Sequence, residues 1–183
     1  MADYTPERGA LPAGIDLTHG IIGRTYKDRA TTVGAAISRR LAPHGGREIS
    51  AYDQELLLPI TAPDLLRKLH VLVELYDSQL LPGQEDLLGI TTVRFDHDLP
   101  AHRQWELARG WAHVAFTARG LAVELVHHLP GLAGRKHKPH CHLLWPVRVL
   151  HGSSTFGQFS DLTKPGAKAI LAAEWAAWLS KEG

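Results

Sequence analysis

The sequence has little that would cross-link the chain, anchor it in a membrane or give it charge of one sign. It contains one cysteine, Cys141, which excludes an internal disulfide framework and a cysteine-rich zinc fold. No apolar run approaches the roughly 18 residues of a membrane span. With 20 basic and 19 acidic residues the net charge is +1, which excludes a strongly basic surface but not a local basic patch.

The composition is that of a globular protein, with 44% hydrophobic and 21% charged residues in 183. A chain of this length buries roughly 70% of its unfolded surface on folding. It therefore needs no disulfide or structural metal to stabilise a core. Proline and glycine in residues 1–14 predict a flexible N-terminal arm, and residues 15–183 are expected to form a single domain. The start of the chain lacks the apolar core of a signal peptide, so we expect a cytoplasmic protein.

Hydrophobic patterning predicts strands and helices without a regular alternation of the two. Strands are expected at 15–22, 49–59, 87–95, 121–128 and 140–150. Helices are expected at 28–41, capped by Asp28, at about 61–81, at 101–119 and at 165–181. This order predicts an α+β fold, with a mostly antiparallel central sheet, helices packed on one face and the other face free for a ligand. Pro146 suggests that its strand is an edge or carries a bulge.

Histidine is the unusual component, since the chain has 12 of them. His140 and His142 stand two apart in an expected strand, so their rings project from one face about 6.5–7 Å apart while Cys141 points into the core. The preceding strand ends at His127-His128, and an antiparallel pairing would bring that end beside His140. We expect His128 to be the third member of a metal-binding cluster, with His127 as the alternative.

Three neutral imidazoles leave coordination positions open, which is typical of a catalytic rather than a structural metal site. An open divalent cation can polarise a phosphate oxygen. The loop between the two histidine strands supplies positive charge suited to a phosphodiester backbone, through Arg135, Lys136 and Lys138, with His137 beside them. The alternative interpretation is a solvated loop. Three arginines upstream are further candidates for this charge: Arg39, Arg40 and Arg47.

These residues lie in segments that resemble the MobA/MobL mobilisation relaxases, members of the HUH endonuclease class. The histidine strands match best, as VELVHH at 123–128 and KPHCHLL at 138–144. Four other segments follow the family pattern: ELLLP (55–59), LPAHRQWELARGWAHVAFTARG (99–120), TFGQFSDL (155–162) and AAEWAAWL (172–179). The similarity covers about residues 31–179 and is strongest from Leu99 onward.

The resemblance implies a relaxase (HUH)-like fold and an enzyme that nicks single-stranded DNA at a plasmid transfer origin. In the family a tyrosine attacks the scissile phosphate and leaves a 5′-phosphotyrosine and a free 3′-hydroxyl. The implied cofactor is Mn²⁺ or Mg²⁺, with Zn²⁺ as a further option, held here by His128, His140 and His142. The implied partners are single-stranded DNA at the origin and accessory mobilisation proteins.

The nucleophile is where the sequence departs from the family. The best match to the family's first helix is TTVGAAISRRL at 31–41, which places Ser38 at the tyrosine position. Tyr26 is the nearest replacement, and Tyr4 and Tyr52 are weaker candidates. Because a serine hydroxyl is far less acidic than a phenol, one alternative function is a catalytically impaired relaxase-like module that binds single-stranded DNA. A replication initiator of the same HUH class is a further alternative.

Overall fold

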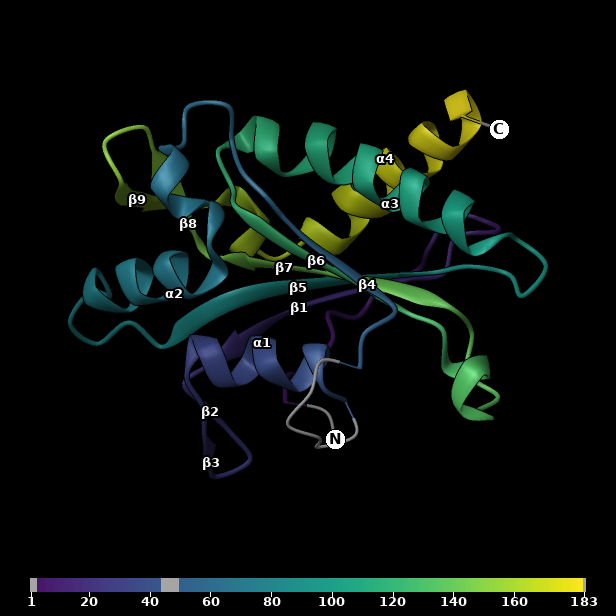
Figure 1. Cartoon of the computed structure of the whole chain (residues 1–183), viewed down its shortest axis with the longest axis horizontal. Coiled ribbons are helices and arrows are strands. Elements are labelled where there is room, and N and C mark those ends of the chain that lie inside the picture. The colour runs from purple at the N-terminus through teal and green to yellow at the C-terminus, as the bar shows by residue number, and fades with distance from the viewer. Residues whose placement is uncertain (1–2, 44–49, 183) are drawn as a thin grey trace.

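A five-stranded antiparallel sheet organises the chain in the computed structural model, which describes residues 3–43 and 50–182 (Figure 1). The strands lie in the order β1-β5-β7-β6-β4. Their bounds are Leu17–Gly23 for β1, Asp86–Arg94 for β5, His140–Pro146 for β7, Val123–His128 for β6 and Asp53–Leu57 for β4. The predicted α+β class with an antiparallel sheet is confirmed.

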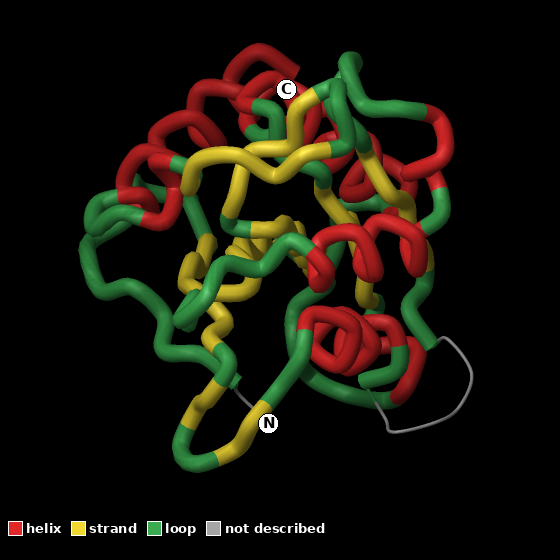
Figure 2. Tube along the Cα trace, turned by 90° about the vertical axis from the view of Figure 1, so that its left-hand side faces the viewer, coloured by secondary structure: helices red, strands yellow, loops and turns green. Residues whose placement is uncertain are grey.

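Helices cover both faces of this sheet, so the expectation that they pack on one face is wrong (Figures 1 and 2). Helices α3 (Ala101–Ala115) and α4 (Ala167–Glu182) lie on one face. Helices α1 (Val33–Leu41) and α2 (Leu69–Ser78) lie on the other. The physical reason is visible in β6, where every residue is buried, as in a strand that is covered on both sides.

Two hydrophobic cores result, one on each face. The first joins α3 and α4 to the sheet through Trp111 and Trp175, whose ring centroids are 5.0 Å apart, and includes Cys141 as a buried core residue. In the same core, Trp145 lies over Gly89, where a β-carbon would come within 2.0 Å of the indole. The second core lies between the sheet and helices α1 and α2 and contains Ile37, Tyr76, Ile90, Val126 and Leu144.

Shorter elements complete the chain. Two hairpins lie outside the main sheet, one from β2 (Thr25–Tyr26) and β3 (Arg29–Ala30) and one from β8 (Arg148–His151) and β9 (Thr155–Phe159). The 3₁₀ turns are η1 (Asp64–Arg67), η2 (Thr117–Arg119), η3 (Pro130–Ala133) and η4 (Asp161–Thr163). Among the described residues no helix is both long and apolar enough to cross a membrane.

Three differences from the sequence expectation change the order or position of elements. Helix α1 begins at Val33 rather than after Asp28, because Thr32 caps it and Asp28, at φ +61°, lies in the turn of the β2–β3 hairpin. The helix expected from 61 begins only at Leu69, after η1. Pro146 ends β7, which is the central strand and not an edge, and the chain resumes as a separate β8.

The segment expected to be a flexible arm makes specific contacts with the domain. The backbone N–H of Glu7 donates to the carbonyl of His19 on β1 at 2.8 Å. The Glu7 carboxylate accepts from the backbone N–H groups of Gly166 and Lys168 near the start of α4. Leu11 packs against the first core. Residues 3–14 are therefore docked along β1.

Candidate metal centre

Strand register brings three histidine rings together on the α1/α2 face of the sheet. His128 on β6 is directly opposite His140 on β7. The next pair on the same face of the sheet is Val126 with His142. The ring centroids lie 5.1 Å (128–140), 5.2 Å (128–142) and 4.9 Å (140–142) apart. One ligand nitrogen of each residue lies within 4.8 Å of the other two, so the cluster could hold a metal ion.

Two of the rings are held in orientation through their Nδ1 atoms. His140 Nδ1 donates to the backbone carbonyl of Lys138 at 2.9 Å, which leaves the lone pair on Nε2. His142 Nδ1 lies 2.8 Å from the hydroxyl Oγ1 of Thr92 on β5. Hydrogen bonds of this kind fix the tautomer and orientation of metal-binding histidines.

The surroundings favour neutral rings, which metal binding requires. Burial lowers the pKa of His142 well below its usual range, and the nearby charges of His140, His128, Arg40 and Arg94 add to this. Burial also lowers the pKa of His140, despite its hydrogen bond to the Lys138 carbonyl. At neutral pH both rings therefore keep a lone pair available. The donor set of three imidazole nitrogens fits a divalent transition-metal ion.

His127, the alternative third ligand, points to the opposite face of the sheet. It is fully buried, its Nε2 lies 2.9 Å from Oε1 of Gln104 on α3, and its ring stacks on Trp105. Burial lowers its pKa to about 4. The structure therefore places His128, and not His127, beside His140 and His142.

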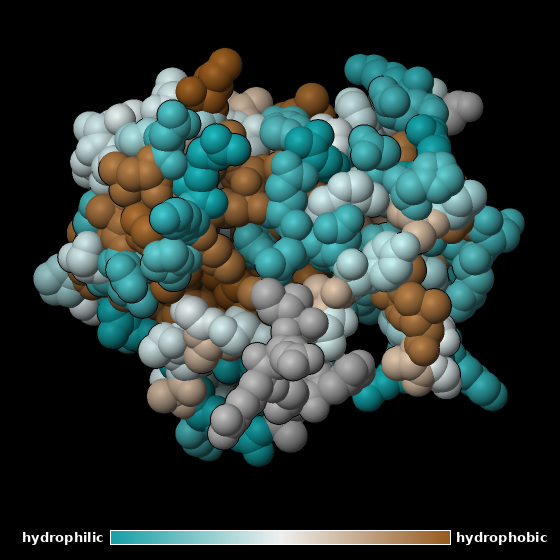
Figure 3. Space-filling model, in the orientation of Figure 1, coloured by the Kyte–Doolittle hydropathy of each residue, from teal (hydrophilic) through white to brown (hydrophobic). Residues whose placement is uncertain are grey.

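A cavity of about 870 Å³ opens over the three histidines. Its basic lining comes from Arg39 and Arg40 on α1 and from Arg135 in the loop after η3. The exposed side chain of Leu132 contributes an apolar lip, and Figure 3 shows apolar surface at the position of this loop. A cavity of this size with a positive rim can admit a phosphodiester segment.

The predicted DNA-binding residues fall in different places. Arg135 lines the cavity, and Lys136 is exposed in the same loop but does not line it. Lys138 forms ion pairs with Asp96 at 3.2 Å and Asp16 at 3.5 Å, and its hydrogen bond and charge interaction with Asp96 are the main causes that raise the pKa of Lys138. Arg47 lies outside the described residues.

The predicted nucleophile is not brought to the cavity. Tyr26 lies in the β2–β3 hairpin, which projects from the body, and Lys27 Nζ sits 5.3 Å from its ring centroid (Figure 1). Ser38 is on the exposed side of α1 and does not line the cavity. Among the described residues, the tyrosines that line it are Tyr4 and Tyr52. Both were weaker candidates in the sequence, where nothing signalled their position.

No protein-family model matches this sequence, and no curated protein is significantly similar to it in sequence. The fold does match a solved structure that concerns the molecular basis of vancomycin resistance transfer in Staphylococcus aureus. The TM-score is 0.73, with 16% identity, over 93% of this chain and 95% of the other. At this identity the likeness is one of fold, and it agrees with the relaxase-like α+β architecture expected from the motifs.

Proposed function

We propose that this protein is a metal-dependent relaxase of the MobA/MobL type, which nicks single-stranded DNA at a plasmid transfer origin and joins the 5′ end to a tyrosine. The observation that carries the proposal is the convergence of His128, His140 and His142 at one point on the sheet. The fold match to a protein of resistance transfer supports it, because such transfer is the process that mobilisation relaxases serve.

The three histidines would hold the cation, for which Mn²⁺ and Mg²⁺ are the first candidates and Zn²⁺ a further one. When bound, a divalent cation polarises the scissile phosphate and stabilises negative charge in the transition state. Lys138 and Thr92 fix the orientation of His140 and His142 through their hydrogen bonds to Nδ1.

Positive side chains guide the DNA strand across the cavity. Arg135 stands at its rim, and Lys136 and Lys138 extend the charge along the loop. Arg39 and Arg40 face the cavity from α1. In the cell the partners would be single-stranded origin DNA in the cytoplasm and accessory mobilisation proteins.

The metal site is tested by Mn²⁺ titration calorimetry on folded variants. The double substitution His140→Ala with His142→Ala should abolish stoichiometric uptake, and His128→Ala should weaken it strongly. His127→Gln is the matched control, because it changes the neighbouring histidine on the opposite face and should keep uptake. Unchanged uptake in the double variant would show that the site is assigned wrongly.

A second candidate function is a relaxase-like module that binds single-stranded DNA without cutting it. Ser38 at the family's tyrosine position favours this reading. Binding of single-stranded DNA by the metal-loaded protein, without any covalent protein–DNA adduct, would support the module over the enzyme.

A further inference from the structure

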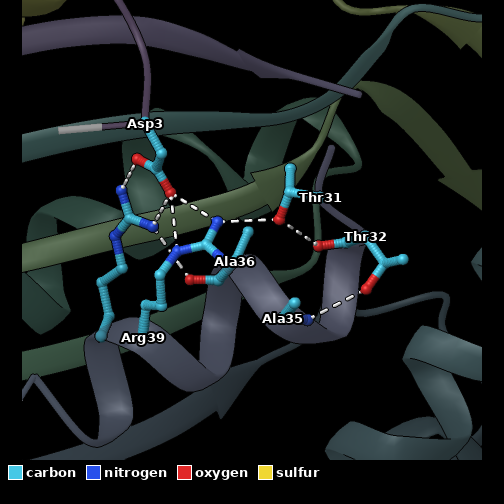
Figure 4. Close-up of polar contacts among 7 residues, drawn as sticks. Asp3, Thr31, Thr32, Ala35, Ala36 and Arg39 are labelled. Atoms are coloured by element: carbon cyan, nitrogen blue, oxygen red, sulfur yellow. Dashed lines mark hydrogen bonds and ion pairs between the residues drawn. The ribbon is translucent and has the colours of Figure 1, made fainter. Parts of the chain in front are cut away.

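Asp3 connects the beginning of the chain to helix α1 through both of its carboxylate oxygens (Figure 4). Arg39 donates to Asp3 Oδ2 from Nε at 3.1 Å and from Nη2 at 2.7 Å. Arg40 donates from Nη1 to the same oxygen at 2.5 Å and from Nη2 to Oδ1. Arg39 also donates to the Thr31 hydroxyl at 2.8 Å, which fixes its side chain.

These contacts are sheltered from water. The Asp3 and Arg40 side chains are only 14% and 10% exposed, so this is a partly buried pair with bidentate geometry rather than a loose surface contact. Burial alone would raise the pKa of Asp3, but the hydrogen bonds and charges of Arg40 and Arg39 outweigh it and the net pKa is lowered. Asp3 is therefore ionised at neutral pH and holds the next residue in place.

The next residue is Tyr4, whose ring lies directly on Gly20 of β1. A β-carbon at Gly20 would come 2.5 Å from Cδ2 and 2.8 Å from Cε2 of Tyr4, so the absence of a side chain makes room for the ring. Gly20 is opposite Ile90, and Ile90 is opposite Leu144, both in the core on the α1/α2 face. The Tyr4 ring therefore lies on the same face as the three histidines.

Tyr4 also lies close to the histidine cluster along the direction of the strands. The neighbouring row of opposed residues is Thr18, Thr92 and His142, so Tyr4 stands one row from His142. A row on one face is about 6.5–7 Å from the next, and two strand spacings separate β1 from β7. Tyr4 lines the histidine cavity, and its hydroxyl makes no hydrogen bond to the residues that the structure describes.

The other tyrosines are less suited. Tyr52 also lines the cavity, but its side chain is 56% exposed and its ring lies edge-on to His127, at 5.5 Å between centroids. Tyr76 is fully buried and donates to the carbonyl of Leu87. Tyr26 lies in the projecting hairpin.

We infer that Tyr4 is the nucleophile, with Asp3, Arg39 and Arg40 as its positioning residues; this rests on the proposed relaxase function. The Tyr4 Oη forms a bond to the scissile phosphorus and the bond from phosphorus to the 3′ oxygen breaks. The phenolic proton passes to solvent, and the departing 3′ oxygen takes a proton from solvent. The products are a 5′-phosphotyrosine at Tyr4 and a free 3′-hydroxyl.

The test is covalent trapping on a pool of single-stranded oligonucleotides of random sequence with Mn²⁺, followed by tryptic digestion and mass spectrometry. Trypsin places the four tyrosines in four different peptides, at residues 1–8, 25–27, 48–67 and 69–94. The nucleotide adduct is expected on the peptide 1–8. An adduct on any other peptide overturns the assignment to Tyr4 while leaving the relaxase function standing.

Tyrosine variants distinguish the role of Tyr4 from the proposed nicking activity. Tyr4→Phe should lose the adduct and keep Mn²⁺ uptake, whereas Tyr26→Phe should form it at the wild-type rate. Continued adduct formation by Tyr4→Phe overturns the inference alone. If the wild-type protein forms no adduct, the proposed nicking activity fails and the role of Tyr4 fails with it.

The positioning role is tested by Asp3→Asn and Asp3→Glu. Asp3→Asn should slow adduct formation without reducing Mn²⁺ uptake or DNA affinity, because it loosens Tyr4 and leaves both arginines in the cavity. Asp3→Glu, which keeps the carboxylate, should recover part of the rate. Equal rates in Asp3→Asn and the wild-type protein would show that Asp3 does not position Tyr4.

Discussion

Thr92 and His142 face each other across β5 and β7, with the hydroxyl of one 2.8 Å from Nδ1 of the other. Thr92 is buried, so the contact is shielded from competing water. The pairing makes the orientation of one candidate metal ligand, His142, depend on β5, a strand that carries no member of the histidine cluster.

Replacing Thr92 by valine keeps the shape of the side chain and removes the hydroxyl. We expect Mn²⁺ affinity to fall by about 10–100-fold, as is typical when the partner of a ligating histidine is lost. Titration calorimetry measures this directly. Thr91→Val is the matched control, since Thr91 lies on the opposite face and contacts His19 instead. Equal affinities in the two variants would contradict an orienting role for Thr92.

Arg135 and Lys138 should contribute differently to DNA binding. Arg135→Gln should lower the slope of log affinity against log salt by about 0.7 for single-stranded DNA, because one phosphate contact is lost. Lys138→Gln should lower it less, since Asp96 and Asp16 already compensate that charge. Fluorescence anisotropy at several salt concentrations measures both slopes. A larger effect of Lys138→Gln than of Arg135→Gln would place the DNA path on the other side of the loop.

Glu124 has a buried carboxyl group. It borders a small apolar cavity together with Val33, Leu72 and Leu144. Burial, with a smaller contribution from the charge of Glu55, raises its pKa from 4.5 to about 7. Its Oε2 has no hydrogen-bond partner among the described residues. Ionisation of this group therefore opposes folding.

The sign of the pH effect follows from linkage. Between pH 4.5 and 7 the folded state binds this proton and the unfolded state does not, so Glu124 makes stability fall as pH rises through that window. Glu124→Gln should remove this fall and leave the protein more stable at pH 8, by up to about 3 kcal/mol. Urea unfolding at pH 5 and pH 8 measures the difference between variant and wild type. A variant no more stable than wild type at pH 8 would contradict the raised pKa.

The candidate metal ligands can be predicted from the sequence because strand periodicity is local. The spacing of His140 and His142 gives a common face, and the end of the preceding strand offers the third ring. The choice between His127 and His128 depends on register, since adjacent residues of a strand face opposite sides. The pairing of His128 with His140 settles which ring joins the cluster.

The position of Tyr4 could not be predicted in the same way. It depends on contacts between Asp3 and arginines 36 and 37 residues further along, and on a glycine in β1 that leaves room for the ring. Sequence patterns carry no signal for such long-range contacts. Tyr26 is the nearest replacement for Ser38 in the sequence, but the chain forms the β2–β3 hairpin there and Tyr26 does not line the cavity.

All three histidines come from the β6–β7 hairpin, and the segment 129–139 that joins these strands carries Arg135 and Lys136. The β6–β7 register places the rings on one face, and within that segment the carbonyl of Lys138 orients His140. Residues 129–137 lie outside both constraints, so their length and charge could change while the geometry of the three histidines is kept. Under the proposed function, a foreign loop grafted in place of residues 129–137 would change the charge offered to DNA and leave the three histidines in position.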